Sequence, residues 1–220
     1  MKPSVPRVLG IGLLLGACSP TFAPPIRTGV GSMPDPAQGT SSAWVAGLGA
    51  NGTSHLRVLH GAASSLDVES TLVMKSDRDH PAQRFFLAGP GLVHRRAPLW
   101  GWLHSALSGG FALGCGGARS GEGGCTLAAG GLSVGADLGA ELFWGLSLYV
   151  ANRLQLSFAQ DVPATLWGLH LAGLQWDASG PWFVTLEVGP WWYENRVERE
   201  SAGTANLAFG FRWDTPASQP

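Results

Sequence analysis

The chain has 220 residues, of which 45% are hydrophobic and only 13% are charged, and its formal net charge at pH 7 is −1. Because soluble domains typically carry about 25% charged residues, this chain has too few charges to solvate an ordinary globular surface. The near-neutral charge, without a basic patch, excludes nucleic acid as an expected partner. Part of the surface is therefore expected to lie against something other than water.

The first residues predict export from the cytoplasm. Lys2 and Arg7 come before a ten-residue apolar run at residues 8–17. A basic start followed by a short apolar core is typical of a signal peptide, whereas a membrane-spanning helix needs about 20 residues. Residues 1–17 are therefore predicted to be a signal peptide.

The sequence LGAC at residues 15–18 resembles the lipobox of bacterial lipoproteins. The resemblance implies that Cys18 becomes the lipidated N-terminus of the mature chain and that the lipoprotein-export machinery is a partner. The alternative is ordinary secretion with cleavage after Ala23, using the small residues Thr21 and Ala23. Residues 18–42 are rich in Pro, Gly and Ser, and we expect a flexible tether because they bury little apolar surface.

Alternation of apolar and polar residues dominates the rest of the chain. Across residues 146–160, Leu, Val and Phe fill most of one phase, and small or polar residues fill the other, as in a strand with one apolar face. This stretch exceeds the usual soluble strand of about 5–6 residues and suits a tilted membrane-spanning strand. Further strands are predicted at residues 43–50, 55–61, 66–74, 84–90, 102–114, 128–138, 165–176, 182–189 and 206–213.

No run after residue 18 predicts a membrane-spanning helix, since charges, His and Gly interrupt every apolar stretch. Only helices and closed barrels satisfy their backbone hydrogen bonds inside a bilayer. The predicted fold is therefore all-β: a closed, antiparallel, up-and-down transmembrane β-barrel over residues 43–213, with a disordered tail at 214–220. Ten strands are expected, with eight or twelve as alternatives, and an even number leaves both ends of the barrel segment on the periplasmic side.

In this pattern the chain resembles bacterial outer-membrane β-barrels. The resemblance implies a location in the outer membrane of the cell envelope, contact with outer-membrane lipid, and insertion by the barrel-assembly machinery. Trp213 is similar to the aromatic residue that closes the last strand in that class. Tryptophans near strand ends are expected to form an aromatic girdle at the two membrane interfaces. The predicted girdle consists of Trp44, Trp102, Trp144, Trp167, Trp176, Trp182, Trp191 and Trp213.

Three long segments are expected to form loops on the outer side, at residues 75–82, 115–125 and 193–203. Cys115 and Cys125 bracket the second of these, which is rich in Gly. In an oxidising compartment, two cysteines this close in sequence predict a disulfide. A metal site is the alternative, although the loop contains no His. The charged run at residues 194–200 is either a solvated loop or a binding segment.

Polar residues in the second phase of the strands are predicted to point into the barrel. They form either a plug of paired charges or a proton path, ion path or catalytic group. Side chains fill the interior of a small barrel, and the nearly balanced charges must pair when buried, which favours the plug. The predicted lumen network consists of Arg57, Asp67, Glu69, His104, Asp137, Arg153, Gln155, His170, Glu187 and Arg212.

His104 and Ser105 invite comparison with lipid-modifying outer-membrane hydrolases. Adjacent residues in a strand point to opposite faces, so this pair is poorly placed for a catalytic dyad; His104 and Ser108 do share a face. We expect no catalysis, cofactor or metal.

The leading hypothesis is a small, lipid-tethered outer-membrane barrel with a structural, adhesive or surface-recognition role. The alternatives are a narrow pore or transporter, a lipid-directed hydrolase, or a soluble β-barrel lipoprotein anchored by Cys18.

Overall fold

The computed structural model describes residues 23–25, 27, 41–49, 53–60, 64–73, 83–96, 102–117, 127–160, 162–177 and 180–214. The predicted signal peptide, Cys18, Cys125, the predicted loop at 75–82 and the tail beyond residue 214 lie outside the described residues. The ten strands of the described part are β1 (Ser41–Gly49), β2 (Ser54–His60), β3 (Ser64–Val73), β4 (Gln83–Arg96), β5 (Leu103–Gly117), β6 (Leu127–Glu141), β7 (Leu146–Ala159), β8 (Val162–Asp177), β9 (Trp182–Glu194) and β10 (Arg199–Asp214).

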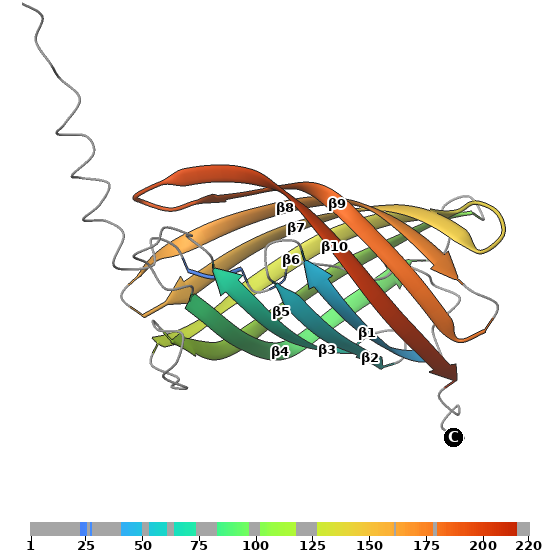
Figure 1. Cartoon of the computed structure of the whole chain (residues 1–220), viewed down its shortest axis with the longest axis horizontal. Helices are drawn as coiled ribbons and strands as arrows, with labels where there is room; N and C mark the ends of the chain where they lie inside the picture. Colours follow the sequence, from blue (N-terminus) through green and yellow to red (C-terminus); the bar gives the residue numbers. More distant parts are fainter. Residues whose placement is uncertain are drawn as a thin grey trace, which may run out of the picture.

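Each strand pairs antiparallel with its neighbours in sequence, and β1 pairs with β10, which closes the sheet into a barrel (Figure 1). The predicted all-β, closed, up-and-down barrel with ten strands is thereby confirmed. The barrel segment begins at Ser41 and ends at Asp214, within two residues of the predicted limits. Among the described residues, no helix is long and apolar enough to cross a membrane.

The two ends of the barrel differ in what they carry. The terminal end holds the start of β1, the end of β10 and the connections that follow β2, β4, β6 and β8. The loop end holds the connections that follow β1, β3, β5, β7 and β9. In Figure 1 the label C marks the side of the terminal end. Both ends of the barrel segment therefore lie on one side, as an even strand number requires.

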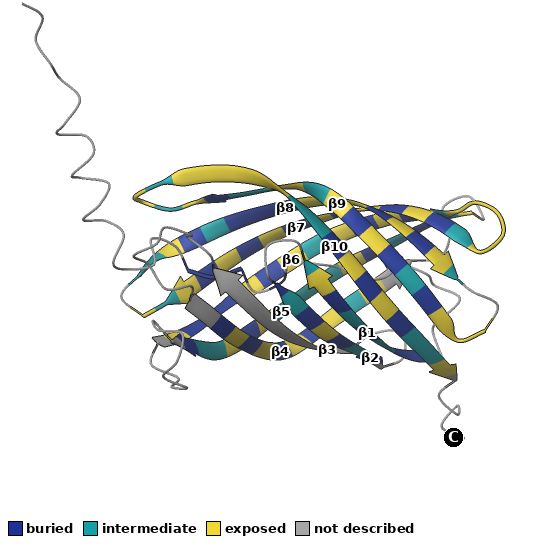
Figure 2. Cartoon of the chain, in the orientation of Figure 1, coloured by how far each residue is buried: buried dark blue, intermediate teal, exposed yellow. Residues whose placement is uncertain are grey.

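Burial alternates along the strands with the period of two that the sequence shows. In β7, buried and exposed residues alternate from Ser147 to Phe158, and Figure 2 shows the same banding on most of the barrel. The exposed phase carries the apolar side chains, including Leu148, Leu154 and Phe158, while the buried phase includes Arg153. The apolar face of this barrel therefore points outward and the polar face points into the lumen.

Glycines let large lumen side chains lie flat against the wall. A Cβ atom on Gly173 would stand 2.1 Å from Cζ of Tyr149, and one on Gly210 would stand 1.9 Å from Cζ of Phe183. Both distances are far below any real contact, so each ring covers the bare backbone of its register partner on the adjacent strand. This packing holds aromatic rings against the lumen wall, where the candidate site lies.

The predicted long outer loop at residues 193–203 is wrong. β9 continues to Glu194 and β10 already begins at Arg199, so residues 195–198 alone form the turn. Asn195 stabilises this turn because its side-chain Oδ1 accepts hydrogen bonds from the backbone N–H groups of Val197 and Glu198. Charge density suggested a loop, but strand pairing extends almost to the tip of the hairpin.

Candidate functional site in the barrel lumen

A buried ion pair joins β6 and β7 on the lumen wall. The guanidinium of Arg153 donates two hydrogen bonds to the carboxylate of Asp137, one from Nη2 to Oδ2 at 2.8 Å and one from Nη1 to Oδ1. Both side chains are less than 10% exposed. Gly135 on β6 makes room for the arginine, because a Cβ there would collide with its guanidinium. This paired geometry neutralises two charges that would be costly to bury singly.

A buried carboxylate lies farther round the barrel wall. Glu187 on β9 is fully buried. Its Oε1 accepts a hydrogen bond from the Tyr149 hydroxyl at 2.5 Å, and its Oε2 accepts one from Asn206 Nδ2 at 3.3 Å. The three strands β7, β9 and β10 thus contribute one group each. Sequence reasoning found Glu187 but missed Tyr149 and Asn206, although both occupy the lumen phase of their strands.

Part of the N-terminal segment lies inside the barrel beside these strands. Ala23, Pro24, Pro25 and Arg27 are all buried, and the short blue trace in Figure 1 marks their position. The prediction of a flexible tether is wrong for these residues. These residues are buried despite their low apolar content, because the lumen wall supplies hydrogen-bond partners for the backbone of Ala23 and Arg27. A ten-stranded lumen is wider than the eight-stranded interior that side chains alone just fill, and this segment takes up the extra space.

Ala23 is held through both of its backbone polar groups. Its N–H donates to Thr165 Oγ1 at 2.9 Å. Its carbonyl oxygen accepts from Trp167 Nε1 at 3.0 Å and from Ser157 Oγ at 3.2 Å. These lumen residues belong to β7 and β8 near the loop end. An extended segment that carries Pro-Pro therefore finds fixed partners, as a buried backbone requires.

Arg27 is anchored by one glutamine side chain. The Arg27 N–H donates to Gln155 Oε1 at 2.9 Å, and Gln155 Nε2 donates to the Arg27 carbonyl at 2.5 Å. The amide therefore pairs with the backbone as a neighbouring strand would. Gln155 was predicted to belong to a lumen network, but its partner on the N-terminal segment was not.

A cluster of aromatic rings lies on the lumen wall near the loop end. Trp167 and Trp191 lie with their ring centroids 5.5 Å apart, and Trp167 and Tyr193 lie 4.9 Å apart. The Tyr193 hydroxyl donates to Glu198 Oε1 at 2.7 Å, which links the cluster to the β9–β10 turn. The cluster includes Trp167, whose Nε1 donates to the Ala23 carbonyl oxygen.

A second ion pair lies near the terminal end. Arg212 on β10 contacts Asp177 at the end of β8, and its guanidinium carbon stands 4.3 Å above the centre of the Phe183 ring. Gln175 Nε2 also donates to Asp177 Oδ2 at 2.8 Å. Both members of this ion pair are partly exposed, unlike Asp137 and Arg153.

The other predicted lumen residues are placed as follows. Arg57 on β2 is buried, and its register partner on β3 is Asp67. Glu69 is the register partner of His55 on the same strand pair. His104 is buried on β5, with its Nε2 3.9 Å from the exposed carboxylate of Glu141. For Asp67 and Glu69, the structure describes the strand register alone.

His170 does not point into the lumen, contrary to the prediction. It is exposed on β8, where its Nδ1 lies 2.7 Å from Asn152 Oδ1 and its Nε2 accepts a hydrogen bond from Trp192 Nε1 at 3.4 Å. Both phases of this strand contain leucines, so the one polar residue His170 was not enough to predict which phase faces the lumen. The neighbouring Thr165 and Gln175, which are buried, mark the true lumen phase.

We expect His170→Leu to change the free energy of unfolding by less than about 1 kcal/mol, because an outward apolar side chain meets lipid or detergent there. The measurement is denaturant unfolding in micelles. Replacing the lumen residue Gln155 by Leu is the matched control. It is expected to cost about 1–3 kcal/mol, because buried backbone groups of Arg27 lose their partner. A larger loss in His170→Leu than in Gln155→Leu would contradict the placement.

The predicted aromatic girdle is wrong for two of its members. Trp167 and Trp191 face the lumen, where they pack against Tyr193. At the terminal end, Trp44 packs against Trp182, with ring centroids 6.0 Å apart. The predicted girdle residues outside the lumen are Trp44, Trp102, Trp144, Trp176, Trp182 and Trp213.

Of the three cysteines, only Cys115 lies among the described residues. Cys115 lies near the loop end of β5 and is disulfide-bonded. Its predicted partner, Cys125, lies outside the described residues, so the pairing stays a prediction. Lipidation of Cys18 stays a prediction for the same reason.

The described residues do not bring His104 and Ser108 together as a catalytic pair. His104 and Ser108 are four positions apart along β5, which places them roughly 13 Å apart in a strand. Within the described part of the chain, no three His, Cys, Asp or Glu side chains are grouped as metal ligands would be.

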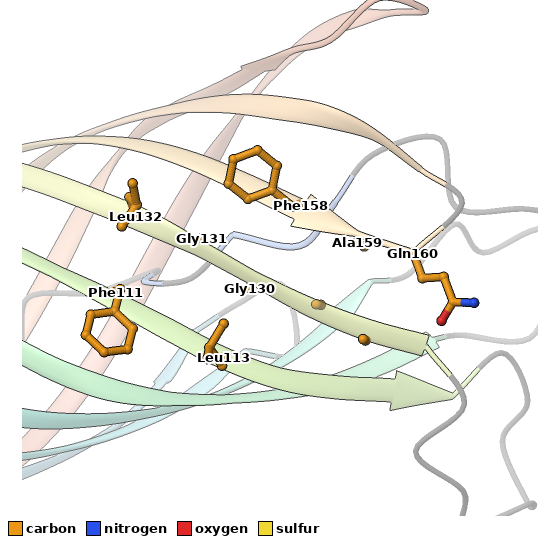
Figure 3. A pocket seen from close by; sticks show the side chains of 10 residues that line it. Phe111, Leu113, Gly130, Gly131, Leu132, Phe158, Ala159 and Gln160 are labelled. Carbon is orange, nitrogen blue, oxygen red and sulfur yellow. The ribbon is translucent and has the colours of Figure 1, made fainter.

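A shallow apolar groove crosses the outer wall near the loop end. Its volume is about 540 Å³, and it runs over β5, β6 and β7 where Gly130 and Ala128 lie between larger side chains. Figure 3 shows Phe111, Leu113 and Phe158 around it. The groove belongs to the outward apolar face and does not open into the lumen network.

The β9–β10 hairpin rises above β1 at the loop end. The register of β10 with β1 begins at Asn206, whereas its register with β9 begins at Arg199. In the described pairings, residues 199–205 are therefore bonded on one side only. Residues 199–203 are all exposed. Arg199 and Glu200, at the start of this one-sided stretch, belong to the charged run 194–200 that was predicted to be either a solvated loop or a binding segment.

The comparisons with known proteins add no family. No family model matches the chain, and no curated protein matches it. Among solved structures, the chain is similar to a KdgM porin in complex with disordered oligogalacturonate, with 11% sequence identity, coverage of 79% of this chain and 98% of that chain, and a TM-score of 0.34.

Proposed function

We propose that this protein is a closed outer-membrane barrel that displays a recognition surface at its loop end. One observation carries the proposal: lumen-facing side chains around the wall, among them Val45, Phe85, Tyr149 and Glu187, are at most 1% exposed. In an open pore such side chains would line water. The burial of these side chains supports a barrel with a closed interior that acts through the surface at its loop end.

The outward face supports a membrane location. Large apolar side chains are exposed on nearly every described strand, from Leu48 on β1 to Phe209 on β10. Soluble monomers rarely expose an apolar patch above a few hundred Å². On β7 the outward residues from Leu148 to Phe158 span ten positions, which is about 25 Å along the axis of a barrel with strands tilted by about 40°. That height matches the apolar band of an outer-membrane barrel.

The charged hairpin supports recognition at the loop end. Along residues 199–205, the backbone N–H and C=O groups that point away from β9 have no strand partner among the described residues, and a sheet edge of this kind binds an extended peptide by strand addition. Glu194, Arg196 and Arg199 are exposed around it, so the surface is polar with charges of both signs. In an outer-membrane barrel with both ends of its strand segment in the periplasm, this edge faces the outside of the cell.

The membrane location predicts a position-dependent cost for a charge on the outer face. Leu154→Arg, at the centre of β7, is expected to lower the free energy of unfolding in bilayers by about 2–4 kcal/mol. Leu142→Arg, in the turn after β6, is the matched control and is expected to cost about 0–1 kcal/mol. Unfolding is followed by the loss of heat-modifiable gel mobility. Equal costs at both positions would contradict a membrane-spanning barrel.

Planar-bilayer recording tests the closed interior. The full-length protein is expected to produce no reproducible conductance steps, because the described lumen-facing side chains named above are at most 1% exposed. Reproducible single-channel steps would overturn the proposed closed scaffold and favour the narrow pore instead.

A further inference from the structure

The part of the N-terminal segment inside the lumen has a direction. Ala23 is bonded to Ser157 and Thr165, close to the loop-end connection between β7 and β8. Arg27 is bonded to Gln155, which lies two positions farther along β7 toward the terminal end. With increasing residue number, the chain therefore runs inward from the loop end. It then has to reach the terminal end, where β1 begins.

The maximum length of an extended chain limits where the residues before Ala23 can leave the barrel. Cys18 is five positions before Ala23, and five residues extend at most about 18 Å. Ser157 is eleven positions from Leu146, the terminal-end start of β7. That separation is about 28 Å along the barrel axis at a strand tilt of about 40°. Residue 18 therefore cannot return to the terminal end.

We propose that the chain threads its own barrel, so that the mature N-terminus emerges at the loop end, opposite the C-terminus. The bonds of Ala23 add a constraint on processing. Cleavage after Ala23 would remove a residue whose N–H and C=O are both held in the lumen, so the mature chain begins before it. The side of the membrane on which the N-terminus emerges rests on the proposed outer-membrane function.

If the loop end faces outward, a segment attached before Ala23 is displayed outside the cell without any separate export step. A lipid on Cys18 would then belong to the leaflet at the loop end. This differs from a tether in the periplasm, which would place the lipid on the same side as the C-terminus. The two arrangements are distinguished by which chain end is accessible.

The first test places the same epitope after Ser19 and, in a second variant, after Pro220 of the full chain. Antibody is expected to bind the N-terminal epitope on intact cells and the C-terminal epitope only after the outer membrane is permeabilised. Binding of both epitopes on intact cells, or of neither before permeabilisation, would overturn the threading. The reverse pattern would keep the chain ends on opposite sides and overturn the orientation in the proposed function.

The second test uses trypsin at the native Arg27. This residue is 3% exposed, so the folded full-length protein is expected to resist cleavage after Arg27 and to lose that resistance on boiling. Ser218→Arg, in the tail after β10, gives a matched site that is expected to be cut without boiling. Cleavage after Arg27 in the folded protein, at the same rate as after Ser218→Arg, would overturn the threading.

The two tests separate the inference from the function on which it partly rests. Trypsin protection is read on any fraction that holds folded protein, whether membrane or soluble. Protection of Arg27 in a soluble fraction without heat-modifiable mobility would overturn the outer-membrane function and leave the threading supported. Cleavage in a heat-modifiable membrane barrel would overturn the threading alone.

Discussion

Replacing Arg153 by methionine is expected to lower the free energy of unfolding by about 3–5 kcal/mol, because the carboxylate of Asp137 stays buried without its partner. Methionine keeps much of the volume of the arginine stem, so the loss reports charge and hydrogen bonding more than packing. The measurement is equilibrium denaturant unfolding of the barrel in micelles or bilayers. The same loss should appear as a lower temperature for the change in gel mobility.

The double variant Arg153→Met with Asp137→Leu is the control for this prediction. Replacing a whole buried ion pair by apolar residues of similar size is often neutral or stabilising. We therefore expect the double variant to recover most of the stability that the single variant loses. Additive losses in the double variant would show that the pair is not coupled and would contradict the described geometry.

Gly173→Ala is expected to cost about 2–6 kcal/mol, which is large for the addition of one methyl group. The new Cβ would stand 2.1 Å from Cζ of Tyr149, so the ring has to move. Over-packing of this kind costs about 1–3 kcal/mol. The movement also breaks the hydrogen bond from Tyr149 to the fully buried Glu187, which adds about 1–3 kcal/mol.

Gly109→Ala provides the matched control, because a Cβ on Gly109 would meet Ser133 O at 3.6 Å, an ordinary contact. We expect this variant to be as stable as the parent protein or slightly more stable, since alanine restricts the unfolded chain. Thermal and denaturant unfolding of both variants would be compared in one detergent. Similar losses at the two glycines would contradict the stacking of Tyr149 on Gly173.

Strict alternation made most of the strands predictable. Residues 146–160 carry their apolar side chains in one phase, so the sequence fixes both the strand and the side that faces outward. The same phases place Asp137 and Arg153 in the lumen, but the ion pair between them depends on the register of β6 with β7, which the phases do not contain. Where each strand stops is decided by pairing, and this is why β9 and β10 extend through charged residues that suggested a loop.

Other parts of the lumen depend on contacts that no local pattern contains. Trp167 and Trp191 are typical of a membrane interface by residue type, yet the lumen near the loop end is wide enough to hold them. His170 lies in a strand whose two phases are both apolar. The composition of residues 18–42 shows that they bury little apolar surface among themselves. It does not show that Ser157, Thr165 and Gln155 provide hydrogen-bond partners for the backbone of part of this segment.

The pairing of β1 with β10 has a consequence for the order of assembly. A ring closed by its first and last strands cannot close until the entire chain has been synthesised, and contacts this far apart in sequence form slowly. A segment that directly precedes β1 therefore does not have to be pushed through a finished ring. The sheet can curl around it, and the final seam between β1 and β10 then encloses a chain that is already in position.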